Sequence, residues 1–268
     1  MKIPFTKAHG AGNDFLLTWA ADAPRDGLPG MARAICDRHT GVGADGWLLV
    51  HATPAAGSDA AIRLFNADGS EPELSGNGTR CAAAFLIDAG LVGGSEMRIA
   101  TGAGVKHLRL VERNGLAFSF EMNMGRPAPS AADLRLELPL EGGAREVAAL
   151  GVGNPQCVVF VEDFDFDWRG LGARIERHPH FPNRTNVSFV RPADEHTLEV
   201  RFFERGVGET MSSGTGSTGA VAAAILRGVA ESPVRVLTPA GPIDLRWDGD
   251  IYLTGPAAIV AGGQFYAG

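Results

Sequence analysis

The stretch RLFNADGSEPELSGNGTRCAAA (63–84) recurs as RFFERGVGETMSSGTGSTGAVA (201–222), displaced by 138 residues without a gap. Eight positions are identical, including an arginine, a phenylalanine, a glutamate and the Ser-Gly-x-Gly run. Upstream, GAGND (10–14) is echoed by GVGNP (151–155). Chance similarity of glycine- and alanine-rich pieces is the alternative, but the gapless register disfavours it. Since only two copies exist, the sequence predicts two similar lobes rather than a solenoid.

Each copy predicts strands packed around one buried helix, and hence an α+β fold. Short β-type segments come at regular spacing along the chain, as in AAIRLF (60–65) and TLEVRFF (197–203). The segments after Gly78 and Gly216 are apolar around most of their circumference and stop at a glycine, Gly90 or Gly228, which is typical of buried helices with glycine C-caps. A further surface helix is expected at MARAICDRH (31–39).

Composition excludes several classes of partner. The 268 residues carry 24 basic and 31 acidic side chains, and a net charge of −7 argues against nucleic acid or an anionic membrane as partner. No apolar run approaches the roughly 20 residues that cross a bilayer, and the first residues lack the apolar core of a signal peptide. The three cysteines, Cys36, Cys81 and Cys157, are far apart in the sequence. We therefore expect no disulfide framework, no metal site and a cytoplasmic setting.

The turns that open the two buried helices predict an anion site. Unpaired N–H groups and the helix dipole behind Ser75 and Ser213 would attract a carboxylate. A plain serine N-cap is the alternative for either turn alone, whereas two matching turns favour one shared site in a cleft between the lobes. An amino acid held there would expose its α-carbon to one side chain from each lobe, an arrangement suited to inverting a stereocentre by acid–base catalysis. A two-lobed amino-acid-binding module would look the same.

Other polar residues lie beside these turns. Arg205 could clamp a carboxylate and Glu204 could take an ammonium group or a proton, unless the two form a plain surface ion pair. Four asparagines lie next to turns or strand ends, where asparagine often serves only to form the turn: Asn13, Asn66, Asn154 and Asn186.

Together these segments resemble the diaminopimelate epimerase family. The matching motifs span about residues 3–262 in the family's order: KAHGAGNDF, CDRHTGVGADG, FNADGSEPELSGNGTRC, GNPQCVVFV, FPNRTNVSFV, ERGVGETMSSGTGSTGA and LTGPA. The resemblance implies two pseudo-symmetric lobes, each a β-barrel-like sheet around a central helix. The N-terminal lobe would span 1–117 with a closing strand at 258–268, and the C-terminal lobe 118–257. It also implies a PLP-independent, homodimeric epimerase that interconverts LL- and meso-diaminopimelate for lysine and peptidoglycan synthesis, with no metal or organic cofactor.

The resemblance also implies roles for individual residues. The substrate would be hydrogen-bonded by Asn13, Asn66, Asn154, Gln156 and Asn186. Arg205 would hold its distal carboxylate and Glu204 would contact the reacting ammonium. The amides of Gly76-Asn77 and Gly214-Thr215 would cradle the reacting carboxylate.

The departures from the family fall on the acid–base residues. The family places a catalytic cysteine before GNG and before GTG, where this chain has Ser75 and Ser213, and a histidine where it has Gln156. A thiol has an ordinary pKa of about 8.5, whereas a hydroxyl is far less acidic and needs an adjacent base. The three cysteines stand where the family also has cysteine, so they are not evident replacements.

Four interpretations of these departures follow. The chain is an epimerase whose serines are assisted by Glu204 or water, or it catalyses another proton transfer on an amino or imino acid. Alternatively, it binds its ligand without turnover, or it is a cysteine enzyme in which both thiols were exchanged for serine. Gln156 counts against the last interpretation, because such an exchange would leave the histidine in place.

Overall fold

The computed structural model describes residues 1–52, 57–127, 129 and 131–267. The chain divides into two compact units, which we describe one at a time. Unit 1 comprises Met1–Met122 and Gly255–Gly268, and unit 2 comprises Asn123–Thr254. None of the helices in the described ranges has the length and apolarity needed to cross a bilayer.

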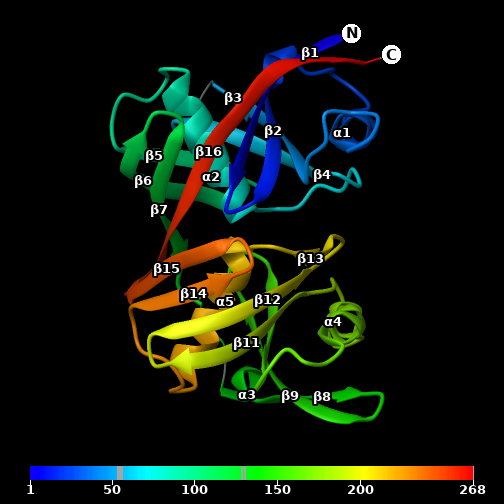
Figure 1. Ribbon diagram of the computed structural model, residues 1–268, viewed down its shortest axis with the longest axis vertical. Helices are drawn as coiled ribbons and strands as arrows, with labels where there is room; N and C mark the ends of the chain where they lie inside the picture. The colour runs from blue at the N-terminus through cyan, green and yellow to red at the C-terminus, as the bar shows by residue number, and fades with distance from the viewer. Residues whose placement is uncertain (53–56, 128, 130, 268) are drawn as a thin grey trace. The chain divides into compact units, whose positions relative to one another are not determined.

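Unit 1 is a closed β-barrel (Figure 1). Its strands follow the order β1-β2-β3-β4-β5-β6-β7-β16, and β16 pairs back onto β1 with Lys2 opposite Tyr266. Alternating burial along β7 turns Phe118, Phe120 and Met122 to the same side, as the two-residue period of a strand requires. The strands are β1 (Lys2–Gly10), β2 (Asn13–Trp19), β3 (Gly46–His51), β4 (Ala60–Asn66), β5 (Glu96–Thr101), β6 (Gly104–Asn114), β7 (Ala117–Gly125) and β16 (Asp250–Tyr266).

Helix α2 (Gly76–Asp88) is the central helix of unit 1. It contacts five strands, β1 to β5, and its residues from Gly76 to Ile87 are all buried. The alanines of this helix suit that position because small side chains let surrounding strands approach closely. The chain leaves the helix through Gly90, whose φ of 72° is left-handed, so the predicted glycine C-cap is confirmed.

Helix α1 (Leu28–Cys36) packs on the outside of the barrel. Its Leu28, Ala32 and Ile35 lie against Trp47 and Phe65. The helix was expected at 31–39 but ends earlier. It stops there because the Asp37 carboxylate accepts hydrogen bonds from the backbone N–H groups of residues 39 and 40, which turns the chain. A short 3₁₀ helix, η1 (Ala20–Asp22), precedes it.

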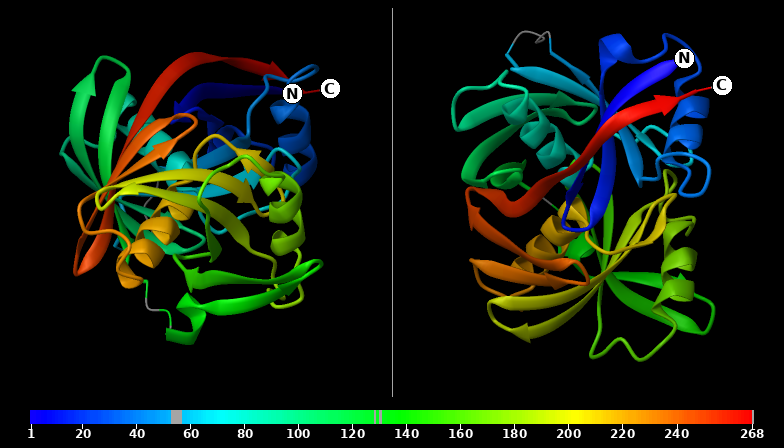
Figure 2. Two further views of the ribbon diagram at one scale, coloured as in Figure 1. Left: turned by 60° about the horizontal axis from the view of Figure 1, so that its bottom comes forward. Right: turned by 45° about the horizontal axis from the view of Figure 1, so that its top comes forward.

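Unit 2 repeats this plan (Figure 2). Its strand order is β16-β15-β14-β12-β11-β10-β9-β8, with β13 added to β12. Helix α5 (Gly214–Leu226) contacts six of these strands and is buried from Gly214 to Ala224, while α4 (Trp168–Glu176) packs outside. The remaining elements are α3 (Ala131–Leu134), β8 (Leu136–Leu140), β9 (Gly143–Gly151), β10 (Pro155–Phe160), β11 (Asn186–Asp194), β12 (Thr197–Glu204), β13 (Gly208–Thr210), β14 (Val234–Thr238) and β15 (Gly241–Asp248).

The sequence repeat therefore corresponds to a structural one. α2 and α5 both have 13 residues and are displaced by 138 positions, which matches the sequence register. Identical residues do not always keep identical partners, however. In unit 1 Arg63 Nε donates to Glu71 at 2.6 Å, whereas in unit 2 the equivalent Glu209 accepts from Arg169 of α4 at 2.6 Å.

Candidate active site

Both central helices begin with the same serine cap. Ser75 Oγ accepts a hydrogen bond from Gly78 N at 3.1 Å, and Ser213 Oγ accepts one from Gly216 N at 3.1 Å. The N–H groups of the first two residues of each helix point out of its end, as helix geometry requires. Each cap therefore combines a hydroxyl with outward amides, and the predicted Gly76-Asn77 and Gly214-Thr215 pairs supply those amides. We call each cap with its polar neighbours a half-site.

Packing explains two of the glycines in these turns. A Cβ at position 216 would lie 2.8 Å from Cδ1 of Phe202, and a Cβ at position 78 would lie 3.3 Å from Leu48 Cδ1. A side chain at either position would push the helix away from its sheet. Glycine at these two positions thus serves close helix–strand packing rather than ligand access.

Ser213 has a carboxylate within hydrogen-bond distance. Its hydroxyl lies 3.0 Å from Glu204 Oε2, and the other oxygen of Glu204 accepts from Thr210 Oγ1 at 2.6 Å. Ser213 is only 3% exposed, so this contact is shielded from bulk water. A hydroxyl held between a helix N–H group and a carboxylate can pass its proton to that carboxylate.

Gln156 and Asn154 lie at the same helix end. Gln156 Nε2 donates to Asn154 Oδ1 at 2.7 Å, and Asn154 Nδ2 lies 3.4 Å from Thr215 Oγ1. Gln156 is buried, and a side chain at Gly219 would come within 3.2 Å of its Cβ. An amide cannot take up a proton near neutral pH, so Gln156 orients Asn154 without acting as a base.

The turn after β12 positions Arg205. Its backbone N–H donates to Asn186 Oδ1 at 3.0 Å, and its guanidinium reaches the carbonyl of Asn183 at 3.2 Å. The next N–H, from Gly206, donates at 3.1 Å to the buried carboxylate of Glu176, which also pairs with Arg184. The turn is thus anchored by its backbone, and Asn186 acts as a structural partner of Arg205.

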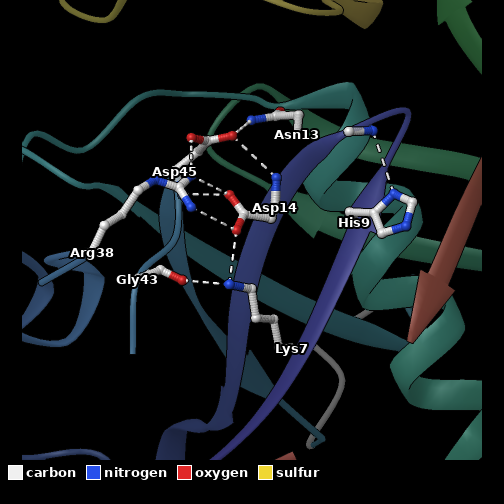
Figure 3. A network of polar contacts seen from close by, with 8 residues as sticks. Lys7, His9, Asn13, Asp14, Arg38, Gly43 and Asp45 are labelled. Atoms are coloured by element: carbon white, nitrogen blue, oxygen red, sulfur yellow. Dashed lines mark hydrogen bonds and ion pairs between the residues drawn. The ribbon is translucent and has the colours of Figure 1, made fainter. Parts of the chain in front are cut away.

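In unit 1, Asn13 belongs to a charged network (Figure 3). Asn13 Nδ2 donates to Asp45 Oδ2 at 2.6 Å, and Arg38 joins Asp45 to Asp14. Lys7 also contacts Asp14 at 3.0 Å. Burial opposes ionisation of Asp14, but the hydrogen bonds from Arg38 and Lys7 outweigh it and hold the pKa of that carboxyl below its ordinary value.

A hairpin turn delivers Asn13 to this network. Ala11 and Gly12 adopt φ values of 49° and 79°, which is the left-handed pair that joins antiparallel strands tightly. Gly153 has a φ of 81° in the matching turn of unit 2, directly before Asn154. The repeated GxGN motif therefore has a conformational cause in both units.

Asn66 sits at the end of β4 and is held by its own turn. Its side-chain amide donates to Ser70 Oγ at 2.9 Å. Asn66 pairs with Gly46 across β3 and β4, directly beside Asp45, the residue that accepts from Asn13.

The three thiols are unsuited to acid–base chemistry. All are unpaired and buried, and burial raises their pKa values: to about 12 for Cys36 and Cys81, and higher still for Cys157. Within the described ranges, no three histidine, cysteine or acidic side chains cluster as metal ligands.

Sequence reasoning missed several members of the half-sites. Thr210, Asp45 and Arg38 carry no motif signal of their own, although all lie inside segments that match the family. The fully buried Arg80 was also missed, and an arginine inside an otherwise apolar helix was the available signal.

Comparison with known proteins identifies the family. A family model described as diaminopimelate epimerase matches residues 5–128 and 148–260. A diaminopimelate epimerase of Pelotomaculum thermopropionicum is 40% identical, covering 97% of this chain and 98% of that protein. One of Aromatoleum aromaticum is also 40% identical, covering 98% of this chain and 99% of that protein.

Solved structures of lower sequence identity share the fold. A hydroxyproline epimerase from Agrobacterium vitis, with trans-4-hydroxy-L-proline bound, superposes with a TM-score of 0.78 at 16% identity, covering 98% of this chain and 92% of that one. A PhzF-family phenazine biosynthesis protein from Bacillus anthracis gives a TM-score of 0.71 at 16% identity, with 98% and 99% of the chains covered. At 40% identity over nearly its full length, the chain belongs to the diaminopimelate epimerase family.

Proposed function

We propose that this protein is a PLP-independent isomerase that interconverts LL- and meso-diaminopimelate, and so serves lysine and peptidoglycan precursor synthesis. The observation that carries the proposal is the pair of serine-capped helices, displaced by 138 residues in a chain that matches diaminopimelate epimerases almost end to end. Two equivalent caps suit a reaction in which one group removes the α-proton and another returns one.

In this proposal Ser75 and Ser213 act on the same α-carbon. The amides of Gly76-Asn77 and Gly214-Thr215 receive the reacting carboxylate, because outward N–H groups at a helix N-terminus favour an anion. Asn13, Asn66, Asn154 and Asn186 orient the amino acid with Gln156, and Arg205 binds the distal carboxylate.

The serines require an assisted mechanism. A serine hydroxyl is too weak an acid to lose its proton unaided near neutral pH. The Glu204 carboxylate, 3.0 Å from Ser213, supplies a base on that side. We therefore propose that Ser213 and Glu204 act as a dyad that accepts the α-proton, and that Ser75 donates the proton on the opposite face.

Proton exchange in heavy water tests the proposal. NMR with LL-diaminopimelate should show loss of the α-proton signal, and Ser75→Ala and Ser213→Ala should each abolish that loss. Ser217→Ala, which removes another buried hydroxyl of α5, is the matched control and should leave exchange intact. Exchange no faster than in protein-free buffer would exclude the epimerase function.

Replacing both serines by cysteine measures how far the serines lower the exchange rate. The double change Ser75→Cys with Ser213→Cys should raise the exchange rate, because a thiol ionises far more readily than a hydroxyl. A flat rate would show that Gln156, in place of the family's histidine, or an altered substrate preference limits the reaction.

A second candidate function is binding of diaminopimelate without turnover. The pairing of two weakly acidic hydroxyls with Gln156 favours it, since the polar residues of both half-sites are kept while the acid–base groups are weakened. Calorimetry would then give tight binding alongside zero exchange, and absence of binding would exclude this candidate.

We also propose that the protein works in the cytoplasm as a homodimer. Light scattering after size exclusion should give twice the mass of the 28.1 kDa chain. A monomeric mass at micromolar concentration would contradict the dimer, and fractionation of the source cells would test the compartment.

A further inference from the structure

Arg80 lies inside the barrel of unit 1, where its guanidinium contacts the backbone of β16. Its side chain is fully buried, and its Nε donates to the carbonyl of Pro256 at 3.2 Å. A Cβ at Gly255 would lie only 2.9 Å from the guanidinium carbon, so a larger residue at 255 would collide with it. The Gly255-Pro256 step of the LTGPA motif is therefore shaped to hold this arginine.

The charge of Arg80 has no acidic counterpart nearby. In the part of the chain that the structure describes, no carboxylate lies within ion-pair distance of its guanidinium, and Nη1 is buried without a hydrogen-bond acceptor. Burial lowers the pKa of Arg80 to about 10, which still leaves it protonated at neutral pH. An unneutralised buried charge destabilises a fold, so a compensating role is expected.

A polarised chain of amides connects Arg80 to the half-site. Arg80 Nη2 donates to Asn77 Oδ1, Asn77 Nδ2 lies 3.3 Å from Asn13 Oδ1, and Asn13 Nδ2 donates to Asp45 Oδ2 at 2.6 Å. A guanidinium can only donate and a carboxylate can only accept. The two ends of the chain therefore fix which way both amides face.

We propose that Arg80 is a positioning residue of the first half-site. Seated on Gly255 and Pro256, it orients Asn77 and, through Asn77, Asn13, and its buried positive charge strengthens carboxylate binding at the N-terminus of α2. The inference rests on the proposed function, because the compensating anion is the reacting carboxylate of the substrate. Unit 2 has Thr218 at the equivalent position, where its hydroxyl donates to the carbonyl of Gly214 at 2.8 Å.

Variants that remove or keep the charge at position 80 separate its electrostatic effect on carboxylate binding from its orientation of Asn77. Calorimetric titration with meso-diaminopimelate should show affinity about tenfold weaker in Arg80→Met, the loss expected when one charge leaves a partly desolvated site. Arg80→Lys should recover part of that loss, since it keeps the charge but not the planar donor. Arg25→Met removes an exposed charge from the same unit and should bind like wild type.

The contact between Gly255 and the Arg80 guanidinium can be tested without changing the charge of Arg80. Gly255→Ala should displace the guanidinium and weaken binding several-fold, about as Arg80→Lys does. Gly262→Ala on the same strand is the control, since a Cβ there meets only Phe5 O at 3.6 Å. Wild-type affinity in both Arg80→Met and Gly255→Ala would overturn the proposal.

Asn77→Asp keeps the proposal falsifiable if the Arg80 variants fail to fold. The new carboxylate would neutralise Arg80, so the unfolding midpoint should rise while affinity falls at least tenfold. A higher midpoint with unchanged affinity would show a purely structural arginine, and a midpoint at or below wild type would refute the unneutralised charge.

If wild type neither binds nor exchanges diaminopimelate, the proposed function fails. Normal wild-type binding with unaffected variants refutes the role of Arg80 alone.

Discussion

Replacing Glu204 by glutamine isolates what its carboxylate does for Ser213. Glu204 Oε2 lies 3.0 Å from Ser213 Oγ, and Oε1 accepts from Thr210 at 2.6 Å. Glutamine keeps the shape but has one acceptor oxygen instead of two, and it cannot take up a proton near neutral pH. Since a positioned general base contributes about 10²–10⁴-fold, we expect α-proton exchange in Glu204→Gln to fall about a thousandfold.

Thr210→Val is the matched control for that change. It removes one hydrogen bond to Glu204 but leaves the carboxylate in place. A hydrogen bond to a charged group contributes about 1.5 kcal/mol, so exchange should slow by only about tenfold. Both variants are compared by NMR in heavy water at saturating LL-diaminopimelate, with their unfolding midpoints measured alongside.

The result that would refute the dyad is specific. If Glu204→Gln exchanges within about threefold of wild type while Ser213→Ala is inactive, Ser213 uses another proton acceptor, and a general-base contribution of the expected size is absent. Equal losses in Glu204→Gln and Thr210→Val would show that Glu204 matters for its hydrogen bonds and not for its basicity.

Three further predictions concern the thiols and the acidic network. Wild-type exchange should resist thiol reagents, because burial raises the pKa of the three native thiols, Cys36, Cys81 and Cys157. The Ser75→Cys, Ser213→Cys double variant should be inactivated by the same reagents. Between the single variants, ultraviolet absorbance of the thiolate against pH should give the lower pKa for Ser75→Cys, by about one unit, since Glu204 faces the other thiol. Asp14→Asn should cost about 2 kcal/mol of unfolding free energy at neutral pH. Because the pKa of Asp14 is lowered from 3.8 in the folded state, that difference should persist above 3.8 and vanish as the pH falls through the folded pKa, as acid titration of the unfolding midpoint would show.

The repeat made the fold predictable from sequence. Two apolar, alanine-rich segments bounded by serine and glycine could only be buried helices, and α2 and α5 confirm them. The expected strands are also present, because their alternating or β-branched composition reports local preference. Six of the described strands were missed: β1, β2, β5, β8, β9 and β13. In β1, β5 and β9 exposed positions break the pattern, and pairing with neighbours holds these strands in place.

The hydrogen-bond partners within the half-sites were beyond sequence reasoning. Nothing local indicates that Thr210 meets Glu204, or that Arg80 reaches a glycine 175 residues further along the chain. Such contacts depend on strand order and register. Even identical repeat positions diverge, as Glu71 and Glu209 show by pairing with arginines from different elements.

The divergence between the two half-sites shows how a duplicated fold acquires unlike groups at its two helix ends. In the 138-residue register, Glu204 corresponds to Asn66, and Arg80 corresponds to Thr218. The first half-site therefore carries the buried Arg80 cation, and the second carries the Glu204 carboxylate 3.0 Å from Ser213. Epimerisation needs one group that accepts the α-proton and one that donates a proton, and the two groups exchange roles when the reaction runs in reverse. In the proposed mechanism, duplication supplies matching caps at the two helix ends, and the unequal charges beside them make Ser75 the donor and the Ser213–Glu204 pair the acceptor in one direction of the reaction.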